Sequence, residues 1–152
     1  MPSADELPAF KEKRDVLFGE NYSDEQRREM GRRFMEAEHY DDALEFFARC
    51  QADEDVRAIA EKAAEKANAP LYLRAMVVLG EDPDEDTLVS IADRAKDQGQ
   101  LSIARVAHHK AGNKEKAEQI GRELLGGEEP HKVEKEDVEN KPENNGDAIE
   151  EE

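Results

Sequence analysis

The chain has 152 residues, of which 40% are charged, with 39 Asp and Glu against 22 Lys and Arg. The net charge of −17 opposes non-specific binding to nucleic acids and to anionic membranes, because both carry negative charge themselves. The length fits one domain with a tail, and the single cysteine, Cys50, excludes an intramolecular disulfide. We therefore expect neither nucleic-acid nor membrane binding, and look to other proteins as partners.

The expected compartment is the cytoplasm. The first ten residues are acidic and lack the basic-then-apolar layout of a signal peptide. The longest apolar stretch near Leu79, residues 75–79, is far too short to span a bilayer.

The first expected helix lies within residues 1–22 and ends at Gly19, with Phe10, Leu17 and Phe18 on its apolar side. A capping box follows, in which the Ser23 hydroxyl accepts from the backbone three residues on and Gln26 reaches back. This box predicts a helix over residues 24–37. A tight turn then leads to Asp41, which we expect to cap a second helix over 42–50.

Two further helix pairs and a last helix are predicted from the same signals. The pairs cover residues 53–79 and 82–111, and the last helix covers 114–125. In the second pair, Asn68 is expected to stop the first helix, and Pro70 to open a helix over 70–79. That helix is apolar almost all round, so we expect it to be buried on most sides. In the third pair, Asp82 is expected to be the N-cap, with Pro83 at the first helical position.

The expected helix starts recur with a nearly constant period. Ser23, Asp53, Asp82 and Asn113 are spaced by 30, 29 and 31 residues. The second helices of the pairs begin at similar offsets, at Asp41, Pro70 and Gln100. No segment alternates in polarity long enough to predict a strand. A period of this size is typical of stacked helical repeats, so the predicted fold is all-α.

The predicted organisation has three parts: an N-terminal helix within 1–22, a repeat domain over 23–126 and an acidic tail over 127–152. The repeat domain is expected to hold helix pairs at about 23–50, 53–79 and 82–111 and a capping helix at 114–125. The tail holds eleven acidic and three basic residues, and we expect it to be disordered. It either only solubilises the chain, binds a basic partner, or folds back on an arginine-rich face.

Residues 24–57 resemble a tetratricopeptide repeat. The positions that carry the resemblance are Gly31, Phe34, Ala43, Phe47 and Cys50, where small residues allow close helix contact and aromatic rings fill the space beside them. The resemblance implies a short right-handed α–α superhelix of helix hairpins. It also implies a protein-interaction module: an adaptor, a scaffold or a peptide-binding chaperone.

The same resemblance suggests a peptide-binding face. In that family the first helix of each pair lines the concave groove, which would place Glu25, Arg28, Arg32 and Met35 there. Arginine forks bind carboxylates in a bidentate manner, so this face is a candidate receptor for an acidic segment. The alternative is that the arginines pair with the chain's own glutamates, namely Glu25, Glu29, Glu36 and Glu38. The family's carboxylate clamp is not expected, because Arg32 and Ile59 stand where it needs asparagines.

No motif for catalysis, a cofactor or a metal is found, so we expect no enzyme activity, no cofactor and no metal site. His108 and His109 are adjacent on a helix and point about 100° apart, which prevents shared chelation; each is expected at a surface or helix end. A second functional reading is an acidic regulatory protein that holds a basic partner mainly by charge. Weak self-association through the ends of the stack is a further expectation.

Overall fold

The protein is a stack of α-helices. The computed structural model describes residues 7–126, and within that range it contains eight α-helices and no strand. The helices are α1 Phe10–Phe18, α2 Asp24–Glu36, α3 Tyr40–Arg49, α4 Asp53–Glu65, α5 Ala69–Leu79, α6 Glu85–Asp97, α7 Leu101–Lys110 and α8 Lys114–Leu124. The all-α prediction is therefore confirmed. The predicted acidic tail over 127–152 lies outside the described residues.

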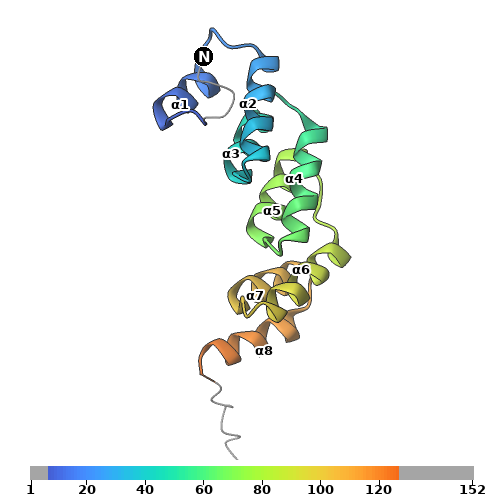
Figure 1. Cartoon of the computed structure of the whole chain (residues 1–152). Coiled ribbons are helices and arrows are strands. Elements are labelled where there is room, and N and C mark those ends of the chain that lie inside the picture. Colours follow the sequence, from blue (N-terminus) through green and yellow to red (C-terminus); the bar gives the residue numbers. More distant parts are fainter. Residues whose placement is uncertain (1–6, 127–152) are drawn as a thin grey trace, which may run out of the picture.

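Consecutive helices pair and the pairs stack. The closest packing joins α2 to α3, α4 to α5, and α6 to α7, and α8 packs on α7 (Figure 1). Contacts of α3 with α5, α4 with α6, and α5 with α7 hold successive pairs together. A continuous core of buried side chains runs from Val16 in α1 to Ala111 at the end of α7. A second, smaller cluster includes Ile120 of α8.

One type of turn recurs along the stack. At five of the seven junctions the helix is followed by a residue in the left-handed region, and the next residue is already the N-cap of the following helix. These N-caps have φ between −83° and −95° and ψ between 63° and 81°. Each also donates its N–H to the carbonyl five residues back, at 2.8–3.0 Å. The N-caps in this repeated turn are His39, Ala52, Asn68, Gln100 and Asn113.

This turn moves several helix starts from their predicted places. The Ser23 capping box is confirmed, with Gln26 N donating to Ser23 Oγ at 3.2 Å and Ser23 N donating to Gln26 Oε1 at 2.9 Å. Asp41 and Asp53 were expected as caps, but both lie inside the first turns of their helices. Because of this turn, the N-caps lie two residues before Asp41 and one residue before Asp53. The carboxylates then favour the helix through its dipole.

The start of α5 shows the same shift. Asn68 was expected to end a helix, but it is the N-cap of the next one, and its Oδ1 accepts from Leu71 N at 3.1 Å. Pro70 is therefore the second residue of α5 rather than the first. A proline is tolerated there because the first N–H groups of a helix have no intrahelical partner.

The junction between α5 and α6 differs from the others. Asp82 was predicted as the N-cap with Pro83 as the first helical residue, but the N-cap is Asp84. The backbone N–H of Asp84 donates to the hydroxyl of the buried Tyr72 at 3.1 Å, while its Oδ2 accepts from Thr87 N at 2.8 Å. A contact to the preceding helix therefore sets where α6 begins.

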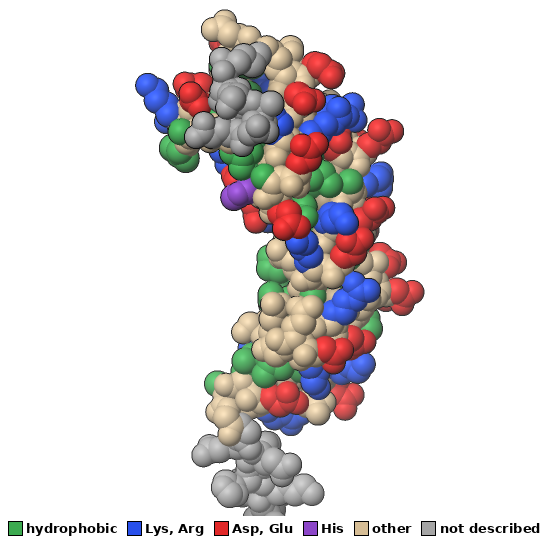
Figure 2. Space-filling model, in the orientation of Figure 1, with side chains coloured by type: hydrophobic (Ala, Val, Ile, Leu, Met, Phe, Trp, Pro, Cys, Tyr) green, Lys and Arg blue, Asp and Glu red, His purple; other side chains and the backbone are tan. Residues whose placement is uncertain are grey.

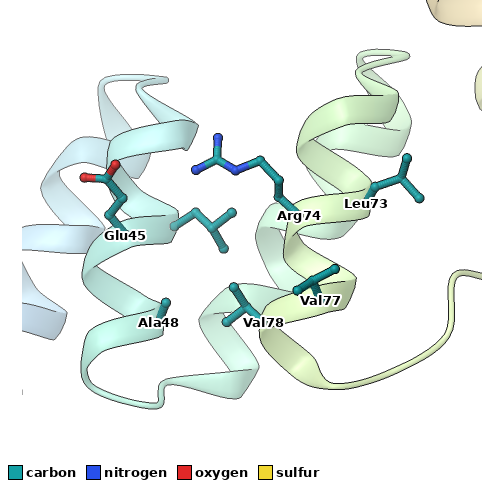
Figure 3. A pocket seen from close by; sticks show the side chains of 7 residues that line it. Glu45, Ala48, Leu73, Arg74, Val77 and Val78 are labelled. Atoms are coloured by element: carbon teal, nitrogen blue, oxygen red, sulfur yellow. The ribbon is translucent and has the colours of Figure 1, made fainter. Parts of the chain in front are cut away.

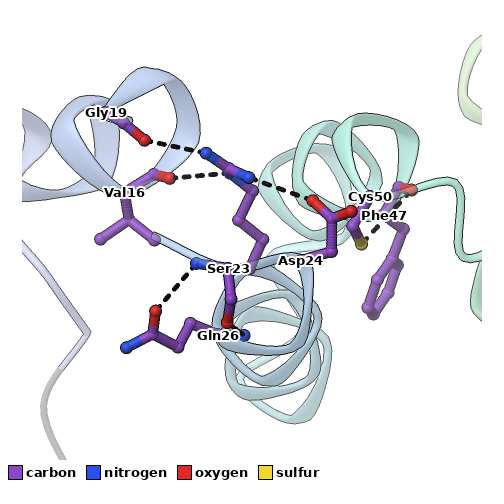
Figure 4. A network of polar contacts seen from close by, with 8 residues as sticks. Val16, Gly19, Ser23, Asp24, Gln26, Phe47 and Cys50 are labelled. Atoms are coloured by element: carbon purple, nitrogen blue, oxygen red, sulfur yellow. Dashed lines mark hydrogen bonds and ion pairs between the residues drawn. The ribbon is translucent and has the colours of Figure 1, made fainter. Parts of the chain in front are cut away.

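Helix α1 is rotated relative to the prediction. Phe10 and Phe18 were expected to pack, but they are 79% and 64% exposed, and the buried residues are Val16 and Leu17. The guanidinium of Arg27 fixes this orientation, since it donates to the carbonyls of Val16 at 3.2 Å and of Gly19 at 2.9 Å (Figure 4). These carbonyls belong to the end of a helix, where intrahelical partners are missing. The Phe18 ring instead lies under Arg49, 5.7 Å from its guanidinium carbon.

The close helix contact predicted for the first pair is confirmed. Gly31, Phe34, Ala43 and Phe47 are all buried between α2 and α3, and Cys50 is half-buried beside them. None of the helices within residues 7–126 has the length and apolar character needed to cross a membrane.

Candidate protein-binding surfaces

The first helices of the pairs carry much of the molecule's visible charge. Figure 2 shows acidic and basic side chains gathered along the edge formed by α2 and α4. On this side, Arg28 Nε donates to Asp55 Oδ2 at 2.6 Å, and the Nε of Arg32 lies 3.6 Å from Asp55 Oδ1. The hydrogen bond to Asp55 raises the pKa of Arg28. Two predicted site residues thus meet on one carboxylate at the start of α4.

Neither of the other two predicted site residues forms an ion pair with these arginines among residues 7–126, although the charge of Glu25, after those of Asp55 and Glu54, also raises the pKa of Arg28. Glu25 lines a cavity between α1 and α2, and Met35 is partly buried against the main core. The alternative explanation had proposed pairing with glutamates near the arginines in sequence. The ion-pair partners are Glu54 and Asp55 instead, on the next hairpin. Binding of an acidic segment to Arg28 and Arg32 stays a prediction, and such a segment would have to compete with Asp55.

A second surface is an apolar groove between α3 and α5, which we call the outer groove. It has a volume of about 350 Å³ (Figure 3). Its walls are Leu44 and Ala48 from α3 and Leu73, Val77 and Val78 from α5. The Val77 side chain is 79% exposed, and Val78 is 38% exposed.

The charged residues at one end of the outer groove are engaged elsewhere. Glu45 pairs with Lys13 of α1 at 2.9 Å, and Arg74 forms an ion pair with Asp41 (Figure 3 shows Glu45 and Arg74 at one end of the groove). These ion pairs do not cover the apolar side chains of the groove, and Val77 and Val78 stay exposed. The ion pairs also join α1 to α3 and α5 to α3.

The sequence contained a signal for this groove, although it was read differently. The helix around residues 70–79 was expected to be buried on most sides because it is apolar almost all round. In the structure Leu71, Tyr72, Ala75 and Met76 are buried, while Val77 and Val78 are not. A helix with more apolar residues than its neighbours can cover is a sign of an interaction surface.

A third hollow, of about 380 Å³, lies between α4 and α6. Its walls are mixed, with Glu61, Glu65, Thr87, Ser90 and Arg94 beside Ala60, Ala64 and Tyr72. Arg94 Nη1 donates to the carbonyls of Ala64 at 3.4 Å and Glu65 at 3.3 Å, at the end of α4. This arginine therefore joins two hairpins across the hollow.

Two residues with reactive or metal-ligating side chains, Cys50 and His108, are half-buried and buried, respectively. Burial raises the pKa of the Cys50 thiol, whose Sγ lies 3.7 Å from the carbonyl of Phe47 (Figure 4), so little reactive thiolate forms. His108 was expected at a surface or helix end. It is near the end of α7 but is only 2% exposed. In residues 7–126, no three His, Cys, Asp or Glu side chains are arranged to hold one metal ion.

Comparison of the chain with protein-family models, with curated proteins and with solved structures finds no match.

Proposed function

We propose that the chain is a tetratricopeptide-like protein-binding module that holds an amphipathic helical segment of a partner protein in its outer groove. The exposure of Val77, at 79%, is the observation that carries this proposal. Exposed apolar side chains that form a continuous groove are typical of interaction surfaces. The buried packing of Gly31 against Phe47 supports the tetratricopeptide-like part, because it is the contact that the family pattern implies.

The shape of the groove favours a helix over an extended strand. Its walls present apolar pairs four residues apart, Leu44 with Ala48 and Leu73 with Val77. Residues at this spacing share one face of a helix and form a ridge along it. A third helix laid between two such ridges would insert its own apolar row. This is the helix-in-groove mode of peptide recognition.

The energetic gain from binding would come from apolar burial. Covering a fully exposed valine contributes on the order of 1.5 kcal/mol. Val77 and Val78 together with the half-exposed Leu73 supply a small apolar centre of this kind. The pairs formed by Glu45 and Arg74 would form a polar rim, as is usual around an interface core.

The proposal is tested by replacing Val77 with glutamate. The residue is exposed, so Val77→Glu should leave the thermal unfolding midpoint nearly unchanged. The matched control is Val106→Glu, a valine on α7 that is 42% exposed and lies outside the groove. In quantitative capture from native lysate, at least one protein should be retained by the wild type and by Val106→Glu but lost with Val77→Glu.

A photoreactive residue at position 77 locates the contact. Adducts should map to a partner segment with apolar residues at helical spacing, and the same probe at position 106 should not give them. Identical protein sets for wild type, Val77→Glu and Val106→Glu would contradict the proposal.

A further inference from the structure

A separate cavity of about 520 Å³ lies where α1 meets α2, and we call it the N-terminal cavity. Its lining comes from Pro8, Glu12 and Val16 on one side and from Tyr22, Glu25, Gln26, Glu29, Met30 and Arg33 on the other. It belongs to neither the outer groove nor the contact between Arg28 and Asp55. The volume falls in the range of pockets that bury a small ligand.

The inner surface of this cavity is apolar. Val16 and Pro8 are buried, Met30 is partly buried against the core, and the ring of Tyr22 stands at the edge with 36% exposure. The walls keep a fixed spacing because Arg27, whose side chain is only 12% exposed, bonds to the end of α1 (Figure 4). The cavity is therefore built into the α1–α2 junction.

The rim of the cavity is negatively charged. Glu12, Glu25 and Glu29 are exposed at its edge, and none of them forms an ion pair with another residue in the range 7–126. Glu25 and Glu29 are four residues apart on one helix, a spacing at which like charges repel. Arg27 bonds to α1 and Arg28 to Asp55, and the lining itself sets one cation, Arg33, against three glutamates, so it is net negative. A cationic occupant would relieve this repulsion.

We propose that the N-terminal cavity binds a short basic segment of a partner protein, with an apolar side chain inserted between flanking lysines or arginines. The apolar side chain contacts Val16 and Met30, and the flanking cations meet the three glutamates. Charge complementarity selects this occupant. An anionic lipid surface or the chain's own tail, with eleven acidic residues against three basic ones, would be repelled by the same rim.

The test uses a blocked hexapeptide with two leucines between two pairs of lysines, titrated into the full chain and followed through the methionine methyl resonances. The methyl of Met30 should shift, while that of Met76, which lies in α5, should not. A peptide with serines in place of the leucines, and one with glutamates in place of the lysines, should bind at least about tenfold more weakly. Equal binding of the serine peptide overturns the proposal, because it would leave only non-specific charge attraction.

A pair of triple variants separates this rim from the overall acidity of the chain. The set Glu12→Gln, Glu25→Gln and Glu29→Gln should weaken the leucine peptide about tenfold. The control set Glu36→Gln, Glu61→Gln and Glu118→Gln removes the same charge from exposed sites elsewhere and should change affinity less than about twofold. Equal losses in the two sets refute the site. Val77→Glu should leave this binding unchanged, so failure of the outer groove and failure of this cavity are distinguished.

Discussion

Gly31 of α2 lies directly against the aromatic ring of Phe47 in α3. A methyl group on Gly31 would come within 2.6 Å of Phe47 Cε1 and 3.1 Å of Phe46 Cβ. Both phenylalanines are fully buried, so neither ring can move aside without disturbing the core. The missing side chain at position 31 therefore sets how closely α2 and α3 approach.

We predict that Gly31→Ala destabilises the protein by about 1–3 kcal/mol, the usual cost of overpacking a core. This loss should appear although alanine favours helix by about 1 kcal/mol over glycine. Urea unfolding followed by circular dichroism measures it. The control is Gly121→Ala in α8, where the added methyl would meet only the side chain of Arg105, at 3.3 Å. That flexible neighbour can shift, so the control should be neutral or stabilised; similar losses at both sites would refute the steric explanation.

The repeated turn predicts that glycine is favoured at two equivalent positions, so that a substitution to glycine at one and a substitution from glycine at the other have opposite effects. Gln51 and Gly99 both follow a helix in the left-handed region, with φ of 54° and 73°. A residue with a side chain loses roughly 1 kcal/mol of stability when its backbone is left-handed. Glycine avoids this cost, but part of the gain is offset because glycine makes the unfolded chain more flexible. Gln51→Gly should therefore stabilise the protein by about 0.5 kcal/mol, and Gly99→Ala should destabilise it by about 1 kcal/mol. A steric clash cannot explain the second change, because nothing lies within 4 Å of the added methyl. Unfolding midpoints that move in the same direction would contradict this prediction.

His108 predicts a pH dependence of stability near neutrality. Burial and the nearby Lys116 and Lys96 lower its pKa in the folded state, and Asp93, 3.8 Å away, only partly offsets this. Below the ordinary pKa of about 6.5 the unfolded chain therefore binds more protons than the folded one. Stability should fall as the pH drops below this value, by at most about 1.4 kcal/mol per pH unit.

The His108 effect is measured as the unfolding free energy between pH 5 and pH 7.5. His108→Leu should flatten this dependence, whereas His109→Leu, at an exposed neighbour, should not. Carboxylates such as Glu81, whose pKa is lowered from 4.5 by its hydrogen bond to Arg57, lose their contribution only at more acidic pH. An unchanged slope in His108→Leu would assign the pH dependence to other groups.

The shared contact of Arg28 and Arg32 with Asp55 predicts competition with an acidic ligand. Asp55→Asn removes the carboxylate that both arginines face. If they form a receptor for acidic segments, the variant should bind a hexaglutamate peptide roughly threefold more tightly than the wild type. Isothermal titration at low salt measures the affinities. Asp53→Asn removes the same charge two residues away, outside the contact with Arg28, and should increase the affinity less. If Asp55→Asn binds the peptide no more tightly than the wild type, the main support for an acidic-segment receptor at Arg28 and Arg32 is lost.

Much of the fold could be predicted because local patterns determine it. The Ser23 box needs only residues 23–26, and the helix spacing follows from apolar periodicity and turn residues. The start of α6 could not be found this way, because it depends on the hydroxyl of Tyr72, twelve residues earlier on another helix. The face that α1 buries depends likewise on Arg27, which lies in the next helix.

The candidate surfaces show the same division. The sequence singled out Arg28 and Arg32 as candidate site residues, but their partner Asp55 lies 27 residues from Arg28, on another hairpin. The outer groove was missed because an all-round apolar helix looks buried until its neighbours are known. The exposure of Val77 follows from the spacing of two hairpins, which no single helix encodes.

The repeated turn also bears on how such a chain can grow. The segment 39–67 begins just after one left-handed residue, Glu38, and ends on another, Ala67. A second copy placed after Ala67 would join both neighbours through the backbone geometry that already exists there. Among residues 7–126 no junction of this kind closes the stack on itself, so the number of helix pairs determines its length. Duplication or loss of such segments would lengthen or shorten the binding surface while preserving the joints.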